Sequence, residues 1–220
     1  MTPFDTLTSV AAPMPDADVD TDIIFPARFL LLTDRHGLGR YAFFEKRFTP
    51  QGAERPDFVL NREPWRGARI LVAGPNFGCG SSREQAPWAL ADLGLRCIIA
   101  PGFGEIFQAN CFANGMLAIV LGRADYARVL HEAEAARPMT VDLTGCTIKL
   151  SGSGDESVGA SVAFEVPRRQ RDALLAGLDE IGLIQRGEAE PIAAFERHQR
   201  ERMPWLFAFA DASAAHAPSP

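Results

Sequence analysis

The feature that most constrains this chain is a regular alternation of short apolar runs with helix-like segments in its middle part. The runs ILVAG (70–74), CIIA (97–100) and LAIVL (117–121) have the composition of buried strands. Each run is followed by a segment with a helical pattern, and Gly94 and Gly115 stand where the first two of these segments end. Buried strands that alternate with helices are typical of a parallel sheet. The sequence therefore predicts an α/β core.

The flanking segments extend this prediction. Residues 4–12 and 21–25 (TDIIF) are predicted to be short strands around an acidic turn, and residues 28–50 to contain a mobile loop. Later strands are expected as an antiparallel addition, followed by two helices; these segments are MTVDL (139–143), TIKL (147–150), SVAFEV (161–166), RRQRDALLAGLDEIGLI (168–184) and EAEPIAAFERHQRERM (188–203). We expect one domain over residues 1–200 and an extension over 201–220, whose Pro-containing tail has the composition of a disordered segment.

Composition argues against several classes of binding partner. The net charge is −6 and no Lys/Arg-rich block stands out, which argues against a nucleic-acid surface. No apolar run reaches the ~18–20 residues that span a bilayer, and the acidic N-terminal residues are unlike a secretory signal. The four cysteines are widely spaced in a chain that needs no disulfide staples. We therefore expect reduced thiols, a cytoplasmic location, and neither a nucleic-acid nor a membrane partner.

The stretch PNFGCGSSREQAPWAL (75–90) follows the first apolar run and opens a predicted helix. Three glycine-rich motifs are tested against it. The dinucleotide-binding fingerprint lacks its third glycine, since Arg83 stands there. The phosphate-binding loop lacks its lysine, and the nucleophile elbow of hydrolases lacks the G-x-S-x-G pattern. None of these three nucleotide-binding or hydrolase chemistries is predicted.

The residue types in this stretch instead suit an anion. Gly78 and Gly80 permit a tight turn and a close approach by a ligand. Ser81 and Ser82 are expected at a helix N-terminus, where free N–H groups favour negative charge, and Arg83 adds a forked donor for a carboxylate. The alternative is that one serine is only an N-cap. If the N–H groups stabilise its alkoxide, Ser81 could act as a base towards a carbon acid.

Two other patterns suggest metal binding at first sight. DADVDTD (16–22) resembles a calcium loop, but Thr21 and Ala27 occupy positions that require glycine and glutamate. The cysteines contain no C-x₂-C pair, so the chain is not expected to hold an iron–sulfur cluster or another metal. Cys79 borders the proposed anion site and is either an oxidation-sensitive thiol or a packing residue. The remaining cysteines, Cys97, Cys111 and Cys146, are expected to be structural.

Four stretches of the chain resemble a known family. These are DVDTDIIFP (18–26), NFGCGSSRE (76–84), IIAPGFGEIFQANCFANGMLAIVL (98–121) and GLDEIGLI (177–184). Together they are similar to the small subunits of 3-isopropylmalate dehydratase, a family that corresponds to the swivelling domain of aconitase. The resemblance covers about residues 4 to 200 in the same order. It implies a swivelling β/β/α domain, as in aconitase domain 4, with C-terminal helices.

The resemblance also implies an activity and a partner. The family acts with a large subunit that carries a 4Fe-4S iron–sulfur cluster, and the small subunit binds no cofactor of its own. The reaction is dehydration of a 2-hydroxy diacid, 2-isopropylmalate, to isopropylmaleate and rehydration to 3-isopropylmalate, in leucine biosynthesis. By motif, Ser81 matches the base, Asp22 the active-site aspartate, and Arg83 a substrate-carboxylate ligand. The remaining substrate ligands implied are Ser82, Gly80 and, in loop 28–40, Arg35.

The chain departs from the family at one position of the motif, because Gln85 stands where histidine is usual. Glutamine cannot carry a positive charge. Two alternatives stay open: a related hydro-lyase that acts on citramalate, homoaconitate or a methyl-substituted maleate, and a non-catalytic anion-binding module. Near the C-terminus, Arg200 to Trp205 form either a docking surface for the large subunit or a helix packed on its own core.

Overall fold

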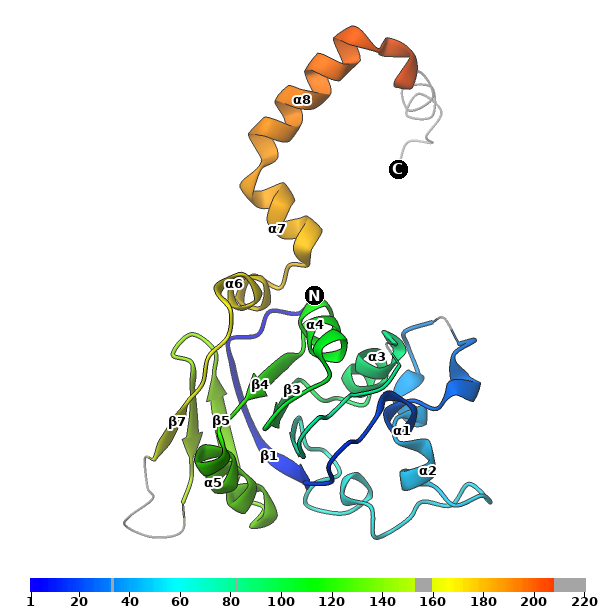
Figure 1. Cartoon of the computed structure of the whole chain (residues 1–220), viewed down its shortest axis with the longest axis vertical. Helices are drawn as coiled ribbons and strands as arrows, with labels where there is room; N and C mark the ends of the chain where they lie inside the picture. The colour runs from blue at the N-terminus through cyan, green and yellow to red at the C-terminus, as the bar shows by residue number, and fades with distance from the viewer. Residues whose placement is uncertain (33, 82, 153–159, 208–220) are drawn as a thin grey trace, which may run out of the picture. The chain divides into compact units, whose positions relative to one another are not determined.

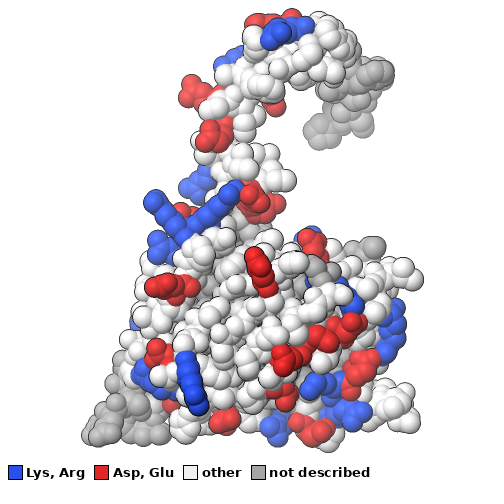
Figure 2. All heavy atoms as spheres, viewed as in Figure 1, with Lys and Arg blue, Asp and Glu red and all other residues white. Residues whose placement is uncertain are grey.

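The computed structural model describes residues 1–32, 34–81, 83–152 and 160–207 (Figure 1). The chain divides into two compact units, one from Met1 to Asp179 and another that begins at Glu180. This division lies ahead of the boundary expected near residue 200, and the extent of the domain stays a prediction. Figure 2 shows acidic and basic side chains interspersed over one face of the first unit. An anion would therefore have to be positioned by local contacts on that face.

A seven-stranded sheet forms the centre of the first unit, in the order β4-β3-β2-β1-β5-β6-β7. The first four strands are mutually parallel and the last three are joined to them antiparallel, as the sequence predicts. The strands are β1 (Thr6–Met14), β2 (Ile70–Ala73), β3 (Cys97–Ala100), β4 (Leu117–Val120), β5 (Pro138–Asp142), β6 (Thr147–Leu150) and β7 (Ser161–Ala163). The prediction of an α/β core with an antiparallel addition is confirmed.

Helices cover both faces of the parallel part of the sheet. Alternate residues of each strand point to opposite faces, and in β2 Leu71 joins one hydrophobic cluster while Ile70 and Val72 join the other. Helices α3 (Gln85–Asp92) and α4 (Glu105–Ala113) bury residues in the first cluster, and α5 (Arg123–Glu134) and α6 (Arg168–Ala176) in the second. Burial on both faces explains why these strands read as continuous apolar runs.

The structure divides one predicted helix into two shorter helices. Residues 168–184 were expected to form a single helix, but α6 ends at Gly177, which has a φ of 65°. The Gly177 and Leu178 amides donate to the carbonyls of Leu174 and Ala173, which closes the helix end. The next helices are α7 (Glu180–Gly187) and α8 (Ala189–Arg202), followed by the 3₁₀ turn η4 (Pro204–Leu206). None of the helices in the described ranges combines the length and the apolar character that a bilayer span requires.

The predicted strand 21–25 is also wrong, since Thr21–Ile24 form the helical turn α1. Asp20 caps this turn, because its Oδ1 accepts a hydrogen bond of 2.7 Å from the Ile23 amide. The buried side chains of Ile24 and Phe25 anchor the turn in the core. Short apolar runs fit a buried turn as well as a strand, and the cap decides here.

The segment 28–50, expected to contain a mobile loop, is in part packed against the core. Leu38 and Phe43 are buried, and the Gly39 amide donates to Asp92 on α3 over 2.7 Å. By contrast, Leu31 is 93% exposed. The short elements in this region are η1 (Ala27–Phe29), η2 (Leu38–Tyr41) and α2 (Phe44–Arg47), and η3 (Val59–Asn61) follows after it. The mobility of the exposed part stays a prediction.

Candidate functional site

The glycine-rich stretch lies between the loops that follow β1 and β3. Adjacent parallel strands bring their carboxyl ends to one edge of the sheet. At this edge isolated parallel bridges continue the pairing, between Asp20 and Cys79 and between Phe77 and Phe103. The Gly78 amide also donates to the Val19 carbonyl over 2.7 Å. Three loops far apart in sequence are thus fixed side by side.

Glycine is required where these loops meet. Gly78 has a φ of 73°, and a Cβ there would lie 2.2 Å from Cγ of the Phe107 ring. A Cβ on Gly104 would lie 2.5 Å from the Gly78 carbonyl oxygen. Gly78 was predicted, with Gly80, to permit a close approach by a ligand, but the space beside Gly78 is filled by the Phe107 ring. The space beside Gly104, for which no such prediction was made, is filled by backbone. Gly80 has a φ of 86° and faces more open space, since the nearest atom to a Cβ at this position would be 3.4 Å away.

A cleft of about 260 Å³ opens beside this junction. Its walls come from Thr21 after β1, from Gly78–Gly80 and Arg83 after β2, and from residues 104–107 at the start of α4. The first-turn amides of α4 have no acceptor within the helix, and Gly104 provides no side-chain cap. Their partial positive charge favours an anion, although the Glu105 carboxylate on the same turn offsets part of it.

Arg83 and Asp22 form a bidentate ion pair at this cleft. Nη1 and Nη2 of Arg83 donate to Oδ1 and Oδ2 of Asp22 over 2.5 and 2.7 Å. The Arg83 side chain is only 12% exposed, whereas that of Asp22 is 52% exposed. The hydrogen bonds from Arg83 hold the pKa of Asp22 below its ordinary value, against a smaller opposing effect of desolvation. Asp22 is therefore charged at neutral pH and fixes the orientation of the guanidinium.

Ser81 lies in an exposed bend rather than at the start of a helix. Helix α3 begins at Gln85, with Glu84 as an N-cap that makes no side-chain capping bond. The expected helix start at the serines, and the alternative that makes Ser81 the N-cap, are both wrong. The Ser81 carbonyl accepts a bond of 2.6 Å from the buried Thr21 hydroxyl, which fixes the backbone while the residue stays exposed. Ser82 lies outside the described residues.

Arg35 is not brought into the cleft. Its guanidinium lies 4.2 Å from the centroid of the Trp88 ring and donates to the Asn114 side chain over 3.3 Å. Asn114 follows the last turn of α4, whereas the cleft is lined by the first turn. Gln85, where the family usually has histidine, is half-buried as the first residue of α3.

Each carboxylate of the acidic turn has its own partner. Asp18 accepts from the Asn76 side chain over 2.7 Å, Asp20 caps α1, and Asp16 lies 3.4 Å from Lys46. With Asp22 bound to Arg83, no pair of these carboxylates shares a partner. Across the described ranges, no group of three or more His, Cys, Asp or Glu residues is placed to hold a metal ion.

The thiols differ in exposure. Cys79 is half-buried at the cleft, and burial raises the pKa of its thiol, with Asp18 and Asp20 raising it further. A thiol of raised pKa is protonated at neutral pH and reacts slowly with oxidants. Burial likewise raises the pKa of Cys97 and of Cys111 in the core. All four cysteines are free thiols.

Sequence reasoning missed the contribution of α4 to the cleft. The segment GFGEIF (102–107) carried a signal, because Gly104 precedes a predicted helix directly after a buried strand. In a parallel sheet, the loop that follows the adjacent strand reaches the same edge as the glycine-rich stretch. The carboxylate partner of Arg83 carried no comparable signal, since 61 positions separate Asp22 from it.

Comparisons with known proteins agree across the chain. Residues 1–124 match the family model of the aconitase C-terminal domain, and residues 188–209 match that of the C-terminal domain of the 3-isopropylmalate dehydratase small subunit. The chain is 49% identical to the 3-isopropylmalate dehydratase small subunit of Paramagnetospirillum magneticum, over 94% of this chain and 100% of that protein. It is also 49% identical to the protein of the same name from Jannaschia sp., with the same coverage.

A solved structure is similar in fold. The crystal structure of 3-isopropylmalate dehydratase from Methanocaldococcus jannaschii superposes with a TM-score of 0.63 and 24% sequence identity. The match covers 86% of this chain and 99% of that one. At this level of identity the likeness speaks for the fold alone.

Proposed function

The chain belongs to the family of 3-isopropylmalate dehydratase small subunits, and from this premise we propose that its Arg83 cleft completes the active site of a two-subunit hydro-lyase. The family and the swivelling α/β fold implied by the sequence motifs are confirmed. The proposed substrate is 2-isopropylmalate, which is isomerised to 3-isopropylmalate through isopropylmaleate in leucine biosynthesis. The proposed partner is a large subunit, and the proposed location is the cytoplasm.

The observation that carries the proposal is the Arg83–Asp22 pair at the cleft. A guanidinium has five N–H donors, and Asp22 engages only part of them. The others can bind a substrate carboxylate in the forked geometry that arginine favours. Asp22 acts as a positioning residue, because it holds Arg83 in place before a substrate arrives.

We assign the proton transfer to Ser81. In dehydration, Ser81 Oγ takes a proton from C3 of 2-isopropylmalate, the C–H electron pair forms the C2=C3 double bond, and hydroxide leaves C2. In hydration the proton returns to C2 and hydroxide adds to C3. An alcohol is a weak base in water, so the site must stabilise its alkoxide. Arg83 and the first-turn amides of α4 supply positive potential, and exclusion of water by the partner subunit would strengthen it.

The departure of hydroxide is not assigned to this chain. The described residues provide no ligand set for an iron–sulfur cluster, and the buried or half-buried thiols do not suit one. We therefore propose that the 4Fe-4S cluster implied by the family lies on the large subunit. Ser82 and the Gly80 backbone stay candidate substrate ligands, and Arg35 could join them only through a change in loop 28–40.

The exposed loop favours a substrate with a branched apolar group, such as 2-isopropylmalate, over the related hydroxy acids. Leu31 is 93% and Leu32 36% exposed, in the segment expected to contact the variable substrate substituent. These side chains suit the isopropyl group better than the additional carboxylate of homoaconitate. Citramalate, with a smaller methyl substituent, should be a poorer substrate by roughly tenfold or more.

Reconstitution tests the proposal. The full chain and a 3-isopropylmalate dehydratase large subunit are combined, and turnover is followed by the absorbance of the unsaturated diacid. Ser81→Ala should lower kcat by roughly a hundredfold to ten-thousandfold, without changing the thermal midpoint or co-purification with the large subunit. Ser161→Ala, at an exposed position in β7, is the matched control and should keep full turnover. Near-normal turnover by Ser81→Ala would refute the assignment of the base.

The same experiment separates the non-catalytic alternative. If the reconstituted complex forms but turns over none of 2-isopropylmalate, citramalate, homoaconitate and a methyl-substituted maleate, the chain is an anion-binding module and not the hydro-lyase subunit. Replacing Gln85 by histidine then asks whether the departure at this position is responsible. Recovery of turnover by Gln85→His would locate the loss of activity at that residue.

A further inference from the structure

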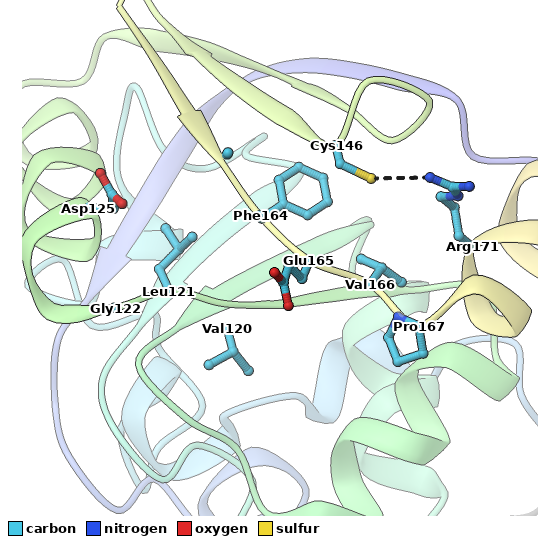
Figure 3. A pocket seen from close by; sticks show the side chains of 11 residues that line it. Val120, Leu121, Gly122, Asp125, Cys146, Phe164, Glu165, Val166, Pro167 and Arg171 are labelled. Carbon is cyan, nitrogen blue, oxygen red and sulfur yellow. Dashed lines mark hydrogen bonds between the residues drawn. The ribbon is translucent and has the colours of Figure 1, made fainter.

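A second and larger hollow, of about 760 Å³, lies in the first unit and shares no residue with the Arg83 cleft. One side is formed by the end of β4 and the start of α5, from Val120 to Asp125. The other is formed by the continuation of β7 into α6, from Ala163 to Arg171 (Figure 3). We call this hollow the β4–β7 groove. No step of the proposed reaction uses it.

Two opposite charges line the groove without pairing. Arg171 donates to the sulfur of Cys146 over 3.8 Å, a weak contact, and its buried Nε has no hydrogen-bond partner. Within the described part of the chain, neither Arg171 nor Glu165 forms an ion pair, and they do not pair with each other. The other carboxylate of the groove, Asp125, is bound to Arg128 over 3.0 Å.

Apolar surface adjoins these charges. Leu121 and Phe164 are buried at the base of the groove, whereas Val120 is 46% exposed. Figure 3 shows Asp125 and Arg171 at opposite ends, with Glu165 between them. A concave site that combines apolar walls with a few separated polar groups is the usual form of a small-molecule site.

We propose that the β4–β7 groove binds a free aliphatic α-amino acid as its zwitterion. The ligand carboxylate would pair with the Arg171 guanidinium, the ammonium with the Glu165 carboxylate, and the side chain would cover Val120. A simple anion would meet Glu165 and Asp125, and a simple cation would meet Arg171, so a ligand with both charges matches the groove best. Such a ligand compensates both charges, which the described protein residues leave unpaired.

Four probes dissect the recognition by isothermal titration calorimetry on the full chain. L-Valine carries all three groups, whereas 3-methylbutanoate lacks the ammonium, isobutylamine lacks the carboxylate, and glycine lacks the side chain. L-Valine should bind saturably at one site, and each of the other three should bind about tenfold more weakly or worse. Equal affinity for 3-methylbutanoate or isobutylamine, or no saturable binding of L-valine into the millimolar range, would overturn the proposal.

Substitutions in the groove test whether L-valine binds there. Glu165→Gln and Arg171→Gln should each weaken L-valine binding about tenfold or more. Glu165 is exposed, so its variant should fold normally even if the Arg171 variant does not. The controls Glu134→Gln and Arg168→Gln remove the same charges from exposed positions outside the groove and should not change the affinity. Arg83→Lys should also bind L-valine unchanged; loss of binding there would place the amino acid in the cleft and contradict the proposal.

Discussion

At the scale of single residues, the pairing of Arg83 with Asp22 determines what the cleft can bind. Arg83 is nearly buried and is held through both of its terminal nitrogens. A third contact, to the Phe25 carbonyl over 3.3 Å, further restricts the guanidinium. Such preorganisation reduces the conformational entropy that the Arg83 side chain loses when a substrate binds. The geometry of the guanidinium fork, more than its charge, should therefore determine how tightly the cleft binds a substrate carboxylate.

Arg83→Lys should weaken substrate binding while keeping the positive charge. Lysine has a single ammonium and cannot engage Asp22 and a substrate carboxylate in the same bidentate manner. We expect KM for 2-isopropylmalate to rise about tenfold or more in the reconstituted enzyme, measured by steady-state kinetics. The matched control is Arg168→Lys, at an exposed arginine 3.7 Å from Asp172. Unchanged KM and kcat in Arg83→Lys would show that the fork has no role.

The residues of the cleft could be predicted from sequence only in part. Local signals identified Arg83, which lines the cleft, and the exposed Ser81 two positions before it, because glycines and a strand end lie next to them. The partner of Arg83 depends on how the chain folds back, and pattern reasoning does not supply that contact. Arg35 was expected near the substrate, but the ring of Trp88 and the amide of Asn114 hold it elsewhere. Ring stacking of this kind has no signature in a single sequence.

At the scale of elements, the close packing of the glycine-rich loop against α4 fixes the cleft wall. The Phe107 ring occupies the place where a Gly78 side chain would lie, and Phe107 is only 3% exposed. The ring also contacts Phe77 edge-on, with 5.6 Å between the ring centroids. Loop and helix are thus interlocked, and neither can shift without the other.

Gly78→Ala should therefore destabilise the protein and distort the cleft together. The new methyl group would clash with a ring that has little room to move, and alanine is disfavoured at a φ of 73°. We expect the free energy of unfolding to fall by about 2–4 kcal/mol, measured by urea denaturation. Gly67→Ala is the control, because nothing lies within 4 Å of a Cβ at Gly67. Equal stability of the two variants would contradict the interlocking.

Element boundaries were the weakest part of the sequence reasoning. The segment TDIIF (21–25) has strand composition, yet Asp20 caps it as a turn because its carboxylate can reach the Ile23 amide. The stretch 168–184 has a continuous helical pattern, yet Gly177 ends it where the chain passes close to Met1. In both cases one local contact overrode the average tendency of the segment. The buried strands β2, β3 and β4 were predictable because burial on both faces leaves a direct trace in composition.

At the scale of the whole molecule, one buried ion pair ties the parallel and antiparallel parts of the sheet together. Glu132 on α5 accepts two bonds, of 2.7 and 2.8 Å, from Arg137 just before β5. It also accepts from the Gly152 amide, after β6, over 3.1 Å. The Glu132 side chain is 6% exposed, and the bonds from Arg137 lower its pKa below the ordinary value.

Glu132→Gln should make the protein less stable at neutral pH and less sensitive to acid. A carboxylate whose pKa is lowered in the folded state stabilises the folded protein at pH values above its unfolded-state pKa of about 4.3. This stabilisation is lost as the pH falls through the folded-state pKa. We expect the free energy of unfolding of Glu132→Gln to be about 1–3 kcal/mol below that of the unsubstituted protein near pH 7. This difference should become smaller below about pH 4. Urea denaturation at both pH values measures it, with the exposed Glu134→Gln as control. A difference that grows in acid would contradict the linkage.

The first unit should fold without the second. Both hydrophobic clusters draw their buried members from residues up to Leu174, and α7 and α8 contain no buried residue. A chain that ends at Asp179 should therefore unfold cooperatively, with a thermal midpoint within about 4 °C of the full chain. Far-ultraviolet circular dichroism, which reports helix content, follows the transition. A truncated chain without a cooperative transition would show that the second unit is needed for folding.

The topology as a whole was beyond the reach of single-sequence patterns. The alternation of apolar runs with helical segments, and the strands that follow it, predicted a parallel part and an antiparallel addition. It did not predict which strand joins these two parts of the sheet. That strand is β1, whose first half pairs with β5 and whose second half pairs with β2. Thr6 pairs with Asp142 and Ala11 with Ile70, so both partners lie far along the chain. Long-range pairing is decided by the whole core and not by any segment of it.

The central place of β1 has a consequence for protein synthesis. The strand leaves the ribosome before both of its partners, and the neighbour for one of its edges, residues 138–142, is translated much later. Until then the nascent chain carries a strand with an open edge, which can pair with other polypeptides. Strand β1 is thus synthesised well before its antiparallel partner, and chaperones that bind nascent chains would protect it for longer than the later strands.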